Sequence, residues 1–416
     1  MEYLFIRKEE CCGCTACASI CPKLAIKMTN DNEGFEYPVI DEKLCIDCGL
    51  CIKVCPIKES DSKNSVIEPQ VFAVKHKSND VRMKSSSGGV YTALTDFILK
   101  GNKEDAKLDQ KCNGSIQGKC YGVTFDKELK VVHKRATTVY DRDKFRGSKY
   151  VQSSLGNVFK QIEKDLKNGD RVFFTGTPCQ ADGLKSYIKT KNINSDNLII
   201  TDVICTGTPS PKVWKDNIEF LEKKYNKKIK DFQFRAKDCG WEGYPSKIYF
   251  DDGSVKKNTI LSRVFTKIFF THLALRPICY ECKYANTQRI SDITLGDFWG
   301  IEEVIPEFKD DKGISLVLVN SLKGQLVFQE VKEELEVRSC SIDKCKKYQH
   351  TFTTSTMIPP ERSKFWSEYK LKGFSYIANK YGGNSLYGRV RYFLIKILKA
   401  LGLFDFIRRR FIYKRG

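Results

Sequence analysis

Residues 11–22 read CCGCTACASICP, and residues 45–56 read CIDCGLCIKVCP. Both stretches follow the spacing Cys-x2-Cys-x2-Cys-x3-Cys-Pro, in which three thiolates of one loop bind one four-iron cluster and the fourth binds the neighbouring cluster. A zinc site typically uses paired Cys-x2-Cys motifs instead. We therefore predict one 4Fe-4S cluster on Cys11, Cys14, Cys17 and Cys55, and a second on Cys21, Cys45, Cys48 and Cys51.

Cysteine usage in the whole chain agrees with metal binding. The 416 residues include 18 cysteines and 4 histidines, and no secretory signal precedes the first cysteine motif. We interpret the cysteines as reduced thiols of a cytoplasmic protein rather than as a disulfide framework. Cys12 lies off the repeat, and we interpret it as a bystander. The weaker pairs Cys112/Cys120 and Cys340/Cys345, and the single Cys239, fit no standard site and are predicted to be unliganded.

The chain is strongly basic, with a formal net charge of +20. Each four-iron cluster with four thiolates carries about −2, so three such clusters would leave about +14. A basic surface suits an acidic cofactor, an anionic membrane or nucleic acid. No recognised nucleic-acid module accompanies the charge, so we do not expect nucleic acid as a partner. No apolar run of about eighteen residues is present, so no membrane-spanning helix is expected.

We predict an α+β ferredoxin module followed by an α/β domain with a partly parallel sheet. The expected divisions are the module at 1–60, a polar linker at 61–70, two parts of the second domain at 71–155 and 156–340, and a basic amphipathic tail at 341–416.

Two consecutive strand–loop–helix units support the parallel sheet. A strand at 171–174 leads to Cys179, and a strand at 197–204 leads to Cys205. Since parallel strands have their carboxyl ends at one edge, these cysteines are expected to meet there. With Cys279 and Cys282 of a later Cys-x2-Cys pair, they could hold a third 4Fe-4S cluster. The alternative, which the spacing leaves open, is that the single cysteines are small buried residues of the core.

A serine–glycine turn, KSSSGG at 84–89, precedes a segment with helical periodicity at 90–99. Free backbone N–H groups at such a helix start suit a phosphate. The turn also fits a plain helix cap, and its composition alone favours the cap.

Five segments in order along the chain together resemble one family. They are KSSSGG, GSKYVQS, FTGTPCQADGL, ICTGTPSPKVW and RPICYECKYANTQRISDITLGDFWG. The sequence resembles the coenzyme F-420 hydrogenase/dehydrogenase beta-subunit family over residues 70–335. Members with a two-cluster ferredoxin module and a basic tail resemble proteins found beside bacterial polysaccharide-biosynthesis enzymes.

The resemblance implies an iron–sulfur flavoprotein with a 4Fe-4S cluster close to FAD. It implies that the ligands of that cluster are Cys179, Cys205, Cys279 and Cys282. It also implies that the flavin diphosphate is bound by Ser86, Ser87, Gly88 and Gly89. Lys149 and Thr177 are further candidates for flavin contacts. Family members often carry Cys-His-Gly where this chain has Cys205-Thr206-Gly207, so a proton-donating histidine is absent or moved.

Two regions are open to two interpretations each. Asp297, Phe298 and Trp299 could line a flavin or substrate pocket, or the two aromatic residues could belong to the core. The segment from 386 onward holds nine Lys or Arg and one acid, with apolar residues at helical spacing. It could lie on an anionic membrane or dock on the protein's own core.

The expected function is that of a cytoplasmic, flavin-dependent iron–sulfur oxidoreductase, with a peripheral position on the inner membrane face as one option. Electrons would pass between a one-electron donor protein such as ferredoxin, the clusters, FAD and a small-molecule acceptor. The acceptor would be a deazaflavin coenzyme or a glycan-pathway substrate. The alternative is a non-catalytic electron-transfer subunit that serves a separate enzyme.

Overall fold

The computed structural model describes residues 4–58, 68–100, 117–241 and 243–401. Most of the expected linker at 61–70, Cys112, and the end of the tail from 402 lie outside the described residues, as does the side chain of Cys239. In the described part, no helix is both long enough and apolar enough to cross a bilayer.

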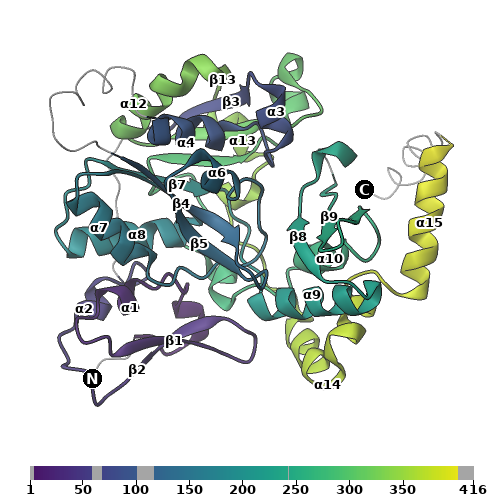
Figure 1. The fold of residues 1–416 in the computed structure, drawn as a ribbon, viewed down its shortest axis with the longest axis horizontal. Coiled ribbons are helices and arrows are strands. Elements are labelled where there is room, and N and C mark those ends of the chain that lie inside the picture. Colours follow the sequence, from purple (N-terminus) through teal and green to yellow (C-terminus); the bar gives the residue numbers. More distant parts are fainter. Residues whose placement is uncertain (1–3, 59–67, 101–116, 242, 402–416) are drawn as a thin grey trace.

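The N-terminal module has the predicted α+β composition (Figure 1). Each cysteine loop runs into a short helix, and one antiparallel hairpin joins the two halves. Its elements are α1 (Ala16–Ile20), β1 (Ile26–Asn30), β2 (Glu36–Ile40) and α2 (Leu50–Lys53).

The second part is built on an eight-stranded sheet in the order β13-β3-β12-β11-β7-β6-β4-β5. The four strands β4, β6, β7 and β11 run parallel, and the outer pairings are antiparallel, which confirms a partly parallel sheet. The strands are β3 (Gln70–His76), β4 (Gly118–Phe125), β5 (Val131–Ala136), β6 (Arg171–Gly176), β7 (Leu198–Val203), β11 (Ile293–Asp297), β12 (Ser315–Val319) and β13 (Leu335–Cys340).

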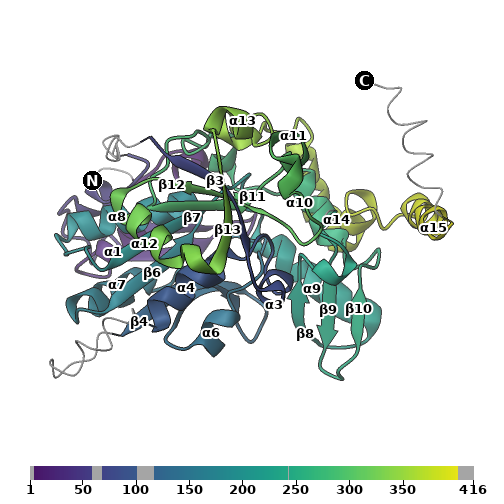
Figure 2. The same cartoon turned by 90° about the horizontal axis from the view of Figure 1, so that it is seen from above.

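Helices cover both faces of this sheet (Figures 1 and 2). Because side chains alternate along a strand, Phe173 and Ile199 pack beneath α4 (Val90–Lys100) and α12 (Leu322–Val331). Their neighbours Phe174 and Ile200 face the other side and pack against α7 (Val158–Lys167) and α8 (Pro178–Thr190).

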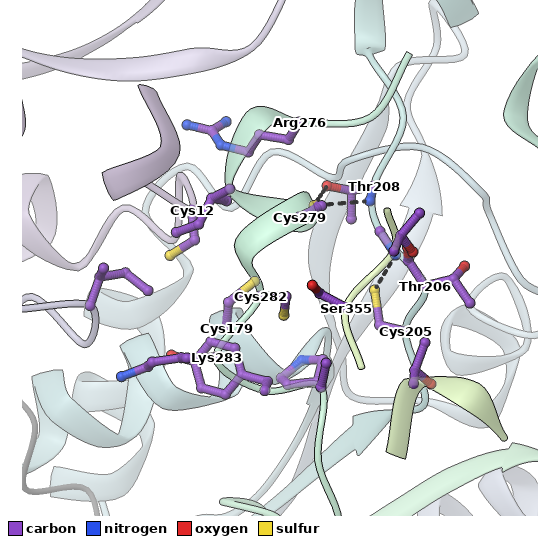
Figure 3. A pocket seen from close by; sticks show the side chains of 18 residues that line it. Cys12, Cys179, Cys205, Thr206, Thr208, Arg276, Cys279, Cys282, Lys283 and Ser355 are labelled. Carbon is purple, nitrogen blue, oxygen red and sulfur yellow. Dashed lines mark hydrogen bonds between the residues drawn. The ribbon is translucent and has the colours of Figure 1, made fainter. Parts of the chain in front are cut away.

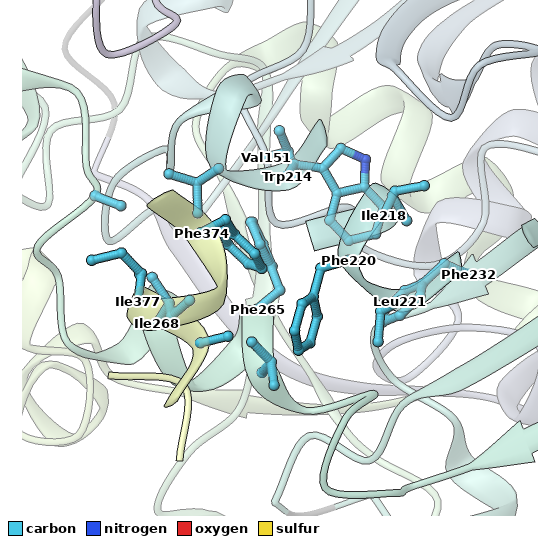
Figure 4. Close-up of a cluster of buried hydrophobic side chains, with 14 of the residues drawn as sticks. Val151, Trp214, Ile218, Phe220, Leu221, Phe232, Phe265, Ile268, Phe374 and Ile377 are labelled. Carbon is cyan, nitrogen blue, oxygen red and sulfur yellow. The ribbon is translucent and has the colours of Figure 1, made fainter. Parts of the chain in front are cut away.

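A second, smaller body lies beside the large sheet. It is a three-stranded antiparallel sheet in the order β10-β9-β8, packed against three helices around Trp214 (Figure 4). The elements are β8 (Ile229–Gln233), β9 (Lys247–Phe250), β10 (Val255–Lys257), α9 (Pro211–Tyr225), α10 (Val264–Phe270) and α14 (Arg362–Lys380).

Helix α14 corrects the expected extent of the tail. Phe365, Tyr369 and Ile377 are buried in the Trp214 core, so this part of 341–416 belongs to the folded body. The basic amphipathic segment begins only at residue 386, where the structure describes α15 (Leu386–Ala400). The remaining short helices are α3 (Asn79–Met83), α6 (Val139–Asp143), α11 (Ile301–Val304) and α13 (Ile342–Lys346).

The N-terminal module packs on the α7/α8 face of the sheet and shares its core. Cys14 and Ala16 are buried in one cluster with Leu184 and Tyr187 of α8. Gly183 makes this approach close, because a Cβ there would lie 2.8 Å from the Cys14 sulfur. The module is therefore seated against the second domain along a helix that begins at the cysteine loop of β6.

Candidate functional site

The carboxyl ends of two neighbouring parallel strands place the first two cysteines of the predicted third site. Cys179 lies in the first turn of α8, directly after β6, and Cys205 follows the end of β7. Cys279 and Cys282 come from the 3-10 turn Pro277–Glu281 and its end. All four line one pocket, shown in Figure 3.

Backbone pairing brings the Cys-x2-Cys turn to this edge of the sheet. Pro209 and Leu275 form an antiparallel bridge, and the Arg276 amide donates to the Thr208 carbonyl at 3.0 Å. The loop after β7 is thereby held beside the turn that carries Cys279. The four sulfurs converge although their residues are far apart in the sequence.

Hydrogen-bond donors point at these sulfurs (Figure 3). The Gly207 amide lies 3.4 Å from the Cys205 sulfur, and the Thr208 amide lies 3.5 Å from the Cys279 sulfur. The Thr177 hydroxyl lies 3.2 Å from the Cys179 sulfur. Donors that stabilise negative charge on sulfur are a regular part of iron–sulfur sites, where they tune the cluster.

The electrostatics of the pocket also favour a bound cationic centre. Burial, followed by the nearby Cys179 and Cys279 sulfurs, raises the pKa of the Cys282 thiol to about 12. Burial likewise raises the pKa of Cys205 and Cys279. Four thiolates at this depth need a metal centre to offset their charge.

The donor set fits a four-iron cluster better than a single ion. Among the described residues, no three His, Cys, Asp or Glu side chains are close enough to hold one metal ion. In a four-iron cluster each thiolate binds a different iron, so the sulfurs stand farther apart than around one ion. Four half-buried cysteines, three of them with a donor to sulfur, fit that arrangement.

The eight cysteines of the N-terminal module separate into the two predicted sets. One cavity is lined by the first set and another by the second, so the cysteine before each proline does reach across to the other loop. The sets are Cys11, Cys14, Cys17 and Cys55, and Cys21, Cys45, Cys48 and Cys51. Cys48 is exposed, whereas Cys14 is buried against the second domain.

Cys12 has a position that the sequence analysis missed. Its side chain is only 4% exposed and lies in hydrogen-bonding contact with both the Cys14 and the Cys179 sulfurs. It also lines the pocket of the third site. Cys12 therefore fills the gap between the inner N-terminal site and the third site. The bystander interpretation followed from its place off the repeat, which carries no information about the neighbouring domain.

Arg276 is a second residue that sequence reasoning missed. It is 1% exposed and donates to the Cys11 carbonyl at 2.7 Å, the Glu36 carbonyl at 3.0 Å and the Gln152 side-chain oxygen at 3.0 Å. Gly13 gives it room, because a Cβ there would lie 2.7 Å from the guanidinium. A buried cation thus stands between two groups of thiolates and ties the module to the second domain.

The serine–glycine turn is held mainly by its own domain. The Ser87 hydroxyl donates to the Ile314 carbonyl at 2.8 Å, and the Gly88 amide donates to the Ser315 hydroxyl at 2.9 Å. A Cβ on Gly88 would collide with the Val74 carbonyl. Packing against β3 and β12 therefore explains this glycine. The Ser86 hydroxyl is half-buried and accepts from the Ser148 amide at 2.7 Å.

The other two flavin candidates occupy different places. The Lys149 ammonium donates to the backbone carbonyls of Lys144 and Arg146 at 2.9 and 3.0 Å. Thr177 caps α8 together with Gln180 and contacts the Cys179 sulfur, so it belongs to the third cysteine site. The flavin contacts, including those of Gly89, stay a prediction.

Asp297 to Trp299, at the end of β11, have packing and ion-pair roles. Phe298 is 1% exposed and is a core residue. Trp299 stacks on Trp241 with ring centroids 5.1 Å apart, and Asp297 accepts from the Arg235 guanidinium at 2.7 Å. The aromatic residues therefore have packing roles, and Asp297 is neutralised by a buried arginine.

Comparison with known proteins finds related families for two parts of the chain. Residues 169–344 match the family model for the C terminus of the beta subunit of coenzyme F420 hydrogenase/dehydrogenase. Over these residues the chain is similar to that family. Residues 10–58 match the 4Fe-4S dicluster domain, so the protein carries an iron–sulfur module. The larger match contains all four cysteines of the third site.

One solved structure is reported as similar to the chain. It belongs to the F420-reducing [NiFe] hydrogenase complex from Methanosarcina barkeri, with a TM-score of 0.46 and 16% identity. The match covers 75% of this chain and 96% of that chain. No curated protein matches the chain significantly.

Proposed function

We propose that this beta-subunit homologue is an iron–sulfur flavoprotein oxidoreductase. It would pass electrons between a one-electron carrier protein, three 4Fe-4S sites, FAD and a small-molecule acceptor. The observation that carries the proposal is the contact of Cys12 with both Cys14 and Cys179. Through that contact the first and third cysteine sites are continuous.

The exposure of the cysteines gives the three sites an order. The set with the exposed Cys48 is the outer one, where a carrier protein can approach. The set with the buried Cys14 is the inner one, and it adjoins Cys12 and Cys179. The proposed path runs from the outer site through the inner site to the third site, or in the reverse direction.

The chain's own groups suit an electron path closed to water. Arg276 supplies a buried positive charge beside Cys11, and its hydrogen bonds fix the distance between module and domain. The amides of Gly207 and Thr208 donate to cysteine sulfurs of the third site. These groups stabilise negative charge where each added electron would reside.

Bound FAD would supply the exchange between one-electron and two-electron chemistry. Among the proposed flavin residues, Ser86 is half-buried and accepts from the Ser148 amide, and Thr177 lies beside the third site. The acceptor class, a deazaflavin coenzyme or a glycan-pathway substrate, rests on the family resemblance.

One observation favours the alternative of a non-catalytic electron-transfer subunit. The loop after β7 reads Cys205-Thr206-Gly207, and no histidine is among the described residues that line the third site. Proton transfer to an acceptor at this place would need another donor. In that case a partner enzyme would complete the reaction.

The deciding experiment is a cofactor count followed by turnover of the anaerobically purified chain. The proposal expects about twelve irons and one FAD per chain, and reoxidation of the reduced flavin by one member of an acceptor panel. About eight irons and no flavin would reject the catalytic assignment. Full cofactor content without reoxidation by any small acceptor would identify the electron-transfer subunit.

A further inference from the structure

Helix α15 (Leu386–Ala400) turns its apolar stripe to solvent. The exposed fractions are 80% for Leu386, 50% for Val390, 60% for Phe393, 55% for Leu394 and 54% for Ile397. These positions recur at intervals of three and four residues and therefore share one face. Figures 1 and 2 both place α15 at the edge of the molecule, beyond the three-stranded sheet.

The side opposite the stripe, with the half-buried Tyr392 and Ile395, faces the protein. The Tyr392 hydroxyl donates to the Asn258 carbonyl at 2.7 Å, and the Arg389 guanidinium donates to the Asn384 carbonyl at 3.1 Å. An amphipathic helix of a globular protein normally buries its apolar face. Helix α14 does so with Phe365 and Ile377. The orientation of α15 is the reverse, so its apolar face is available to something outside the chain.

The charge around the stripe indicates what that occupant is. Residues 386–401 contain four cations, Arg389, Arg391, Lys396 and Lys399, and no acid. On a helical projection Arg389 and Arg391 fall on opposite sides of the apolar stripe. Body cations lie close by as well: the pKa of Lys267 is lowered by burial and then by Arg263 and Arg391. An apolar stripe flanked by cations is complementary to a surface with an apolar interior and anionic groups at its boundary.

A protein occupant fits less well. A stable protein–protein interface needs about 800 Å² and some 20–30 residues from each partner. The stripe of a 15-residue helix offers far less, and in a symmetric dimer of α15 the flanking cations would repel one another. A bilayer has neither difficulty, because lipid headgroups neutralise cations and acyl chains accept apolar side chains.

We propose that α15 lies in the headgroup region of an anionic membrane and anchors the protein to its surface. Leu386, Val390, Phe393, Leu394 and Ile397 would enter the acyl boundary, and the flanking arginines would contact lipid phosphates. In Figures 1 and 2 the N-terminal module lies at the opposite end of the molecule from α15. A membrane-bound protein would therefore leave its outer cysteine site open to a carrier protein.

Vesicle co-sedimentation of the full, cofactor-loaded chain tests the anchor. The wild type should bind vesicles that contain about 30 mol% phosphatidylglycerol at least tenfold more tightly than pure phosphatidylcholine vesicles, and about 0.5 M salt should weaken the binding. The triple variant Phe393→Glu/Leu394→Glu/Ile397→Glu should lose at least tenfold in binding to the anionic vesicles. Unchanged iron content would verify that it is folded.

The matched control is the pair Leu322→Glu/Leu326→Glu on α12, whose side chains are 69% and 71% exposed. It adds charge at exposed leucines elsewhere and should bind as the wild type does. Equal loss in both variants, or no binding by the wild type, would overturn the proposal. Light scattering without lipid tests whether a second copy of the chain binds the stripe instead. If the wild type is a dimer, and the triple variant is a monomer with unchanged vesicle binding, the stripe is a dimer interface and the proposal is wrong.

Discussion

The N-terminal cysteine sites and the third cysteine site are built in opposite ways. The eight N-terminal ligand candidates lie between residues 11 and 55, where two short loops and two short helices hold them. The four candidates of the third site lie between 179 and 282 and come from three loops of the second domain. Local spacing specifies the first pair of sites, whereas sheet topology specifies the third. The two kinds of site should therefore respond differently to the same kind of mutation.

Replacing a single ligand should have the largest effect, and it tests whether the N-terminal sites and the third site bind iron independently. Cys282→Ala should remove about four of about twelve irons and leave the N-terminal sites intact. Cys48→Ala should remove about four irons from the outer site and leave the third. Iron analysis and EPR of the reduced protein distinguish the two losses. Unchanged iron in Cys282→Ala would show that this cysteine is not a ligand.

The contact between the two kinds of site depends on Arg276. Arg276→Met should lower the free energy of unfolding by about 3–5 kcal/mol, because it leaves buried carbonyl groups and thiolates without their donor. Denaturant unfolding monitored by cluster absorbance measures the loss. Arg338→Met, at an exposed arginine of β13, is the control and should change little. Equal stability of Arg276→Met and the wild type would contradict a docking role.

His133 is buried close to the third site, and it should make the free energy of unfolding depend on pH. Burial lowers the pKa of His133 to about 4, and its ring contacts Ser153 and the Thr175 carbonyl. The unfolded chain takes up this proton near pH 6.5, so stability falls as the pH drops from about 6.5 to 4, by up to about 3 kcal/mol.

Unfolding curves of wild type and His133→Gln over this pH range measure the effect. The variant should be less stable at pH 7 but should lose less on acidification. His350→Gln, at an exposed position, should keep the wild-type slope. A slope unaffected by His133→Gln would assign the acid sensitivity to other groups.

The smallest effect is expected at the Cys340/Cys345 pair. The two sulfurs lie 3.2 Å apart at the far edge of the sheet, and no further cysteine lines that place among the described residues. Cys340→Ser should retain the full iron content and the EPR spectrum. Loss of iron would reveal a fourth site that neither spacing nor topology indicates.

The sequence predicted those parts of the fold that depend on neighbouring residues. The helical periodicity at 90–99 agrees with α4, and the strands expected at 171–174 and 197–204 agree with β6 and β7. The meeting of Cys179 and Cys205 was also predictable, because consecutive parallel strands end at one edge. Strand β13 was missed, since an edge strand with exposed polar residues shows little hydrophobic pattern.

What could not be predicted depends on contacts between distant segments. Cys12 lies off the motif, and its role follows only from the seating of the module beside Cys179. Arg276 stands next to a Pro before the Cys-x2-Cys pair and gives no sign of its partners near residue 11. The serine–glycine turn was predicted as a start of a helix, but its glycine at 88 is explained by packing against β3.

The hydrogen bond from Arg276 to Cys11 joins residues 265 positions apart, and this has a consequence for biosynthesis. During translation, residues 11–55 are complete long before residues 276–282 leave the ribosome. Iron insertion at the N-terminal sites can therefore precede synthesis of half the ligands of the third site. Docking through Arg276 follows and covers the Cys12 side of the inner site, and Arg362, which pairs with Glu33 of the module, is synthesised later still. Until then, the Cys12 side of the inner site is open to solvent.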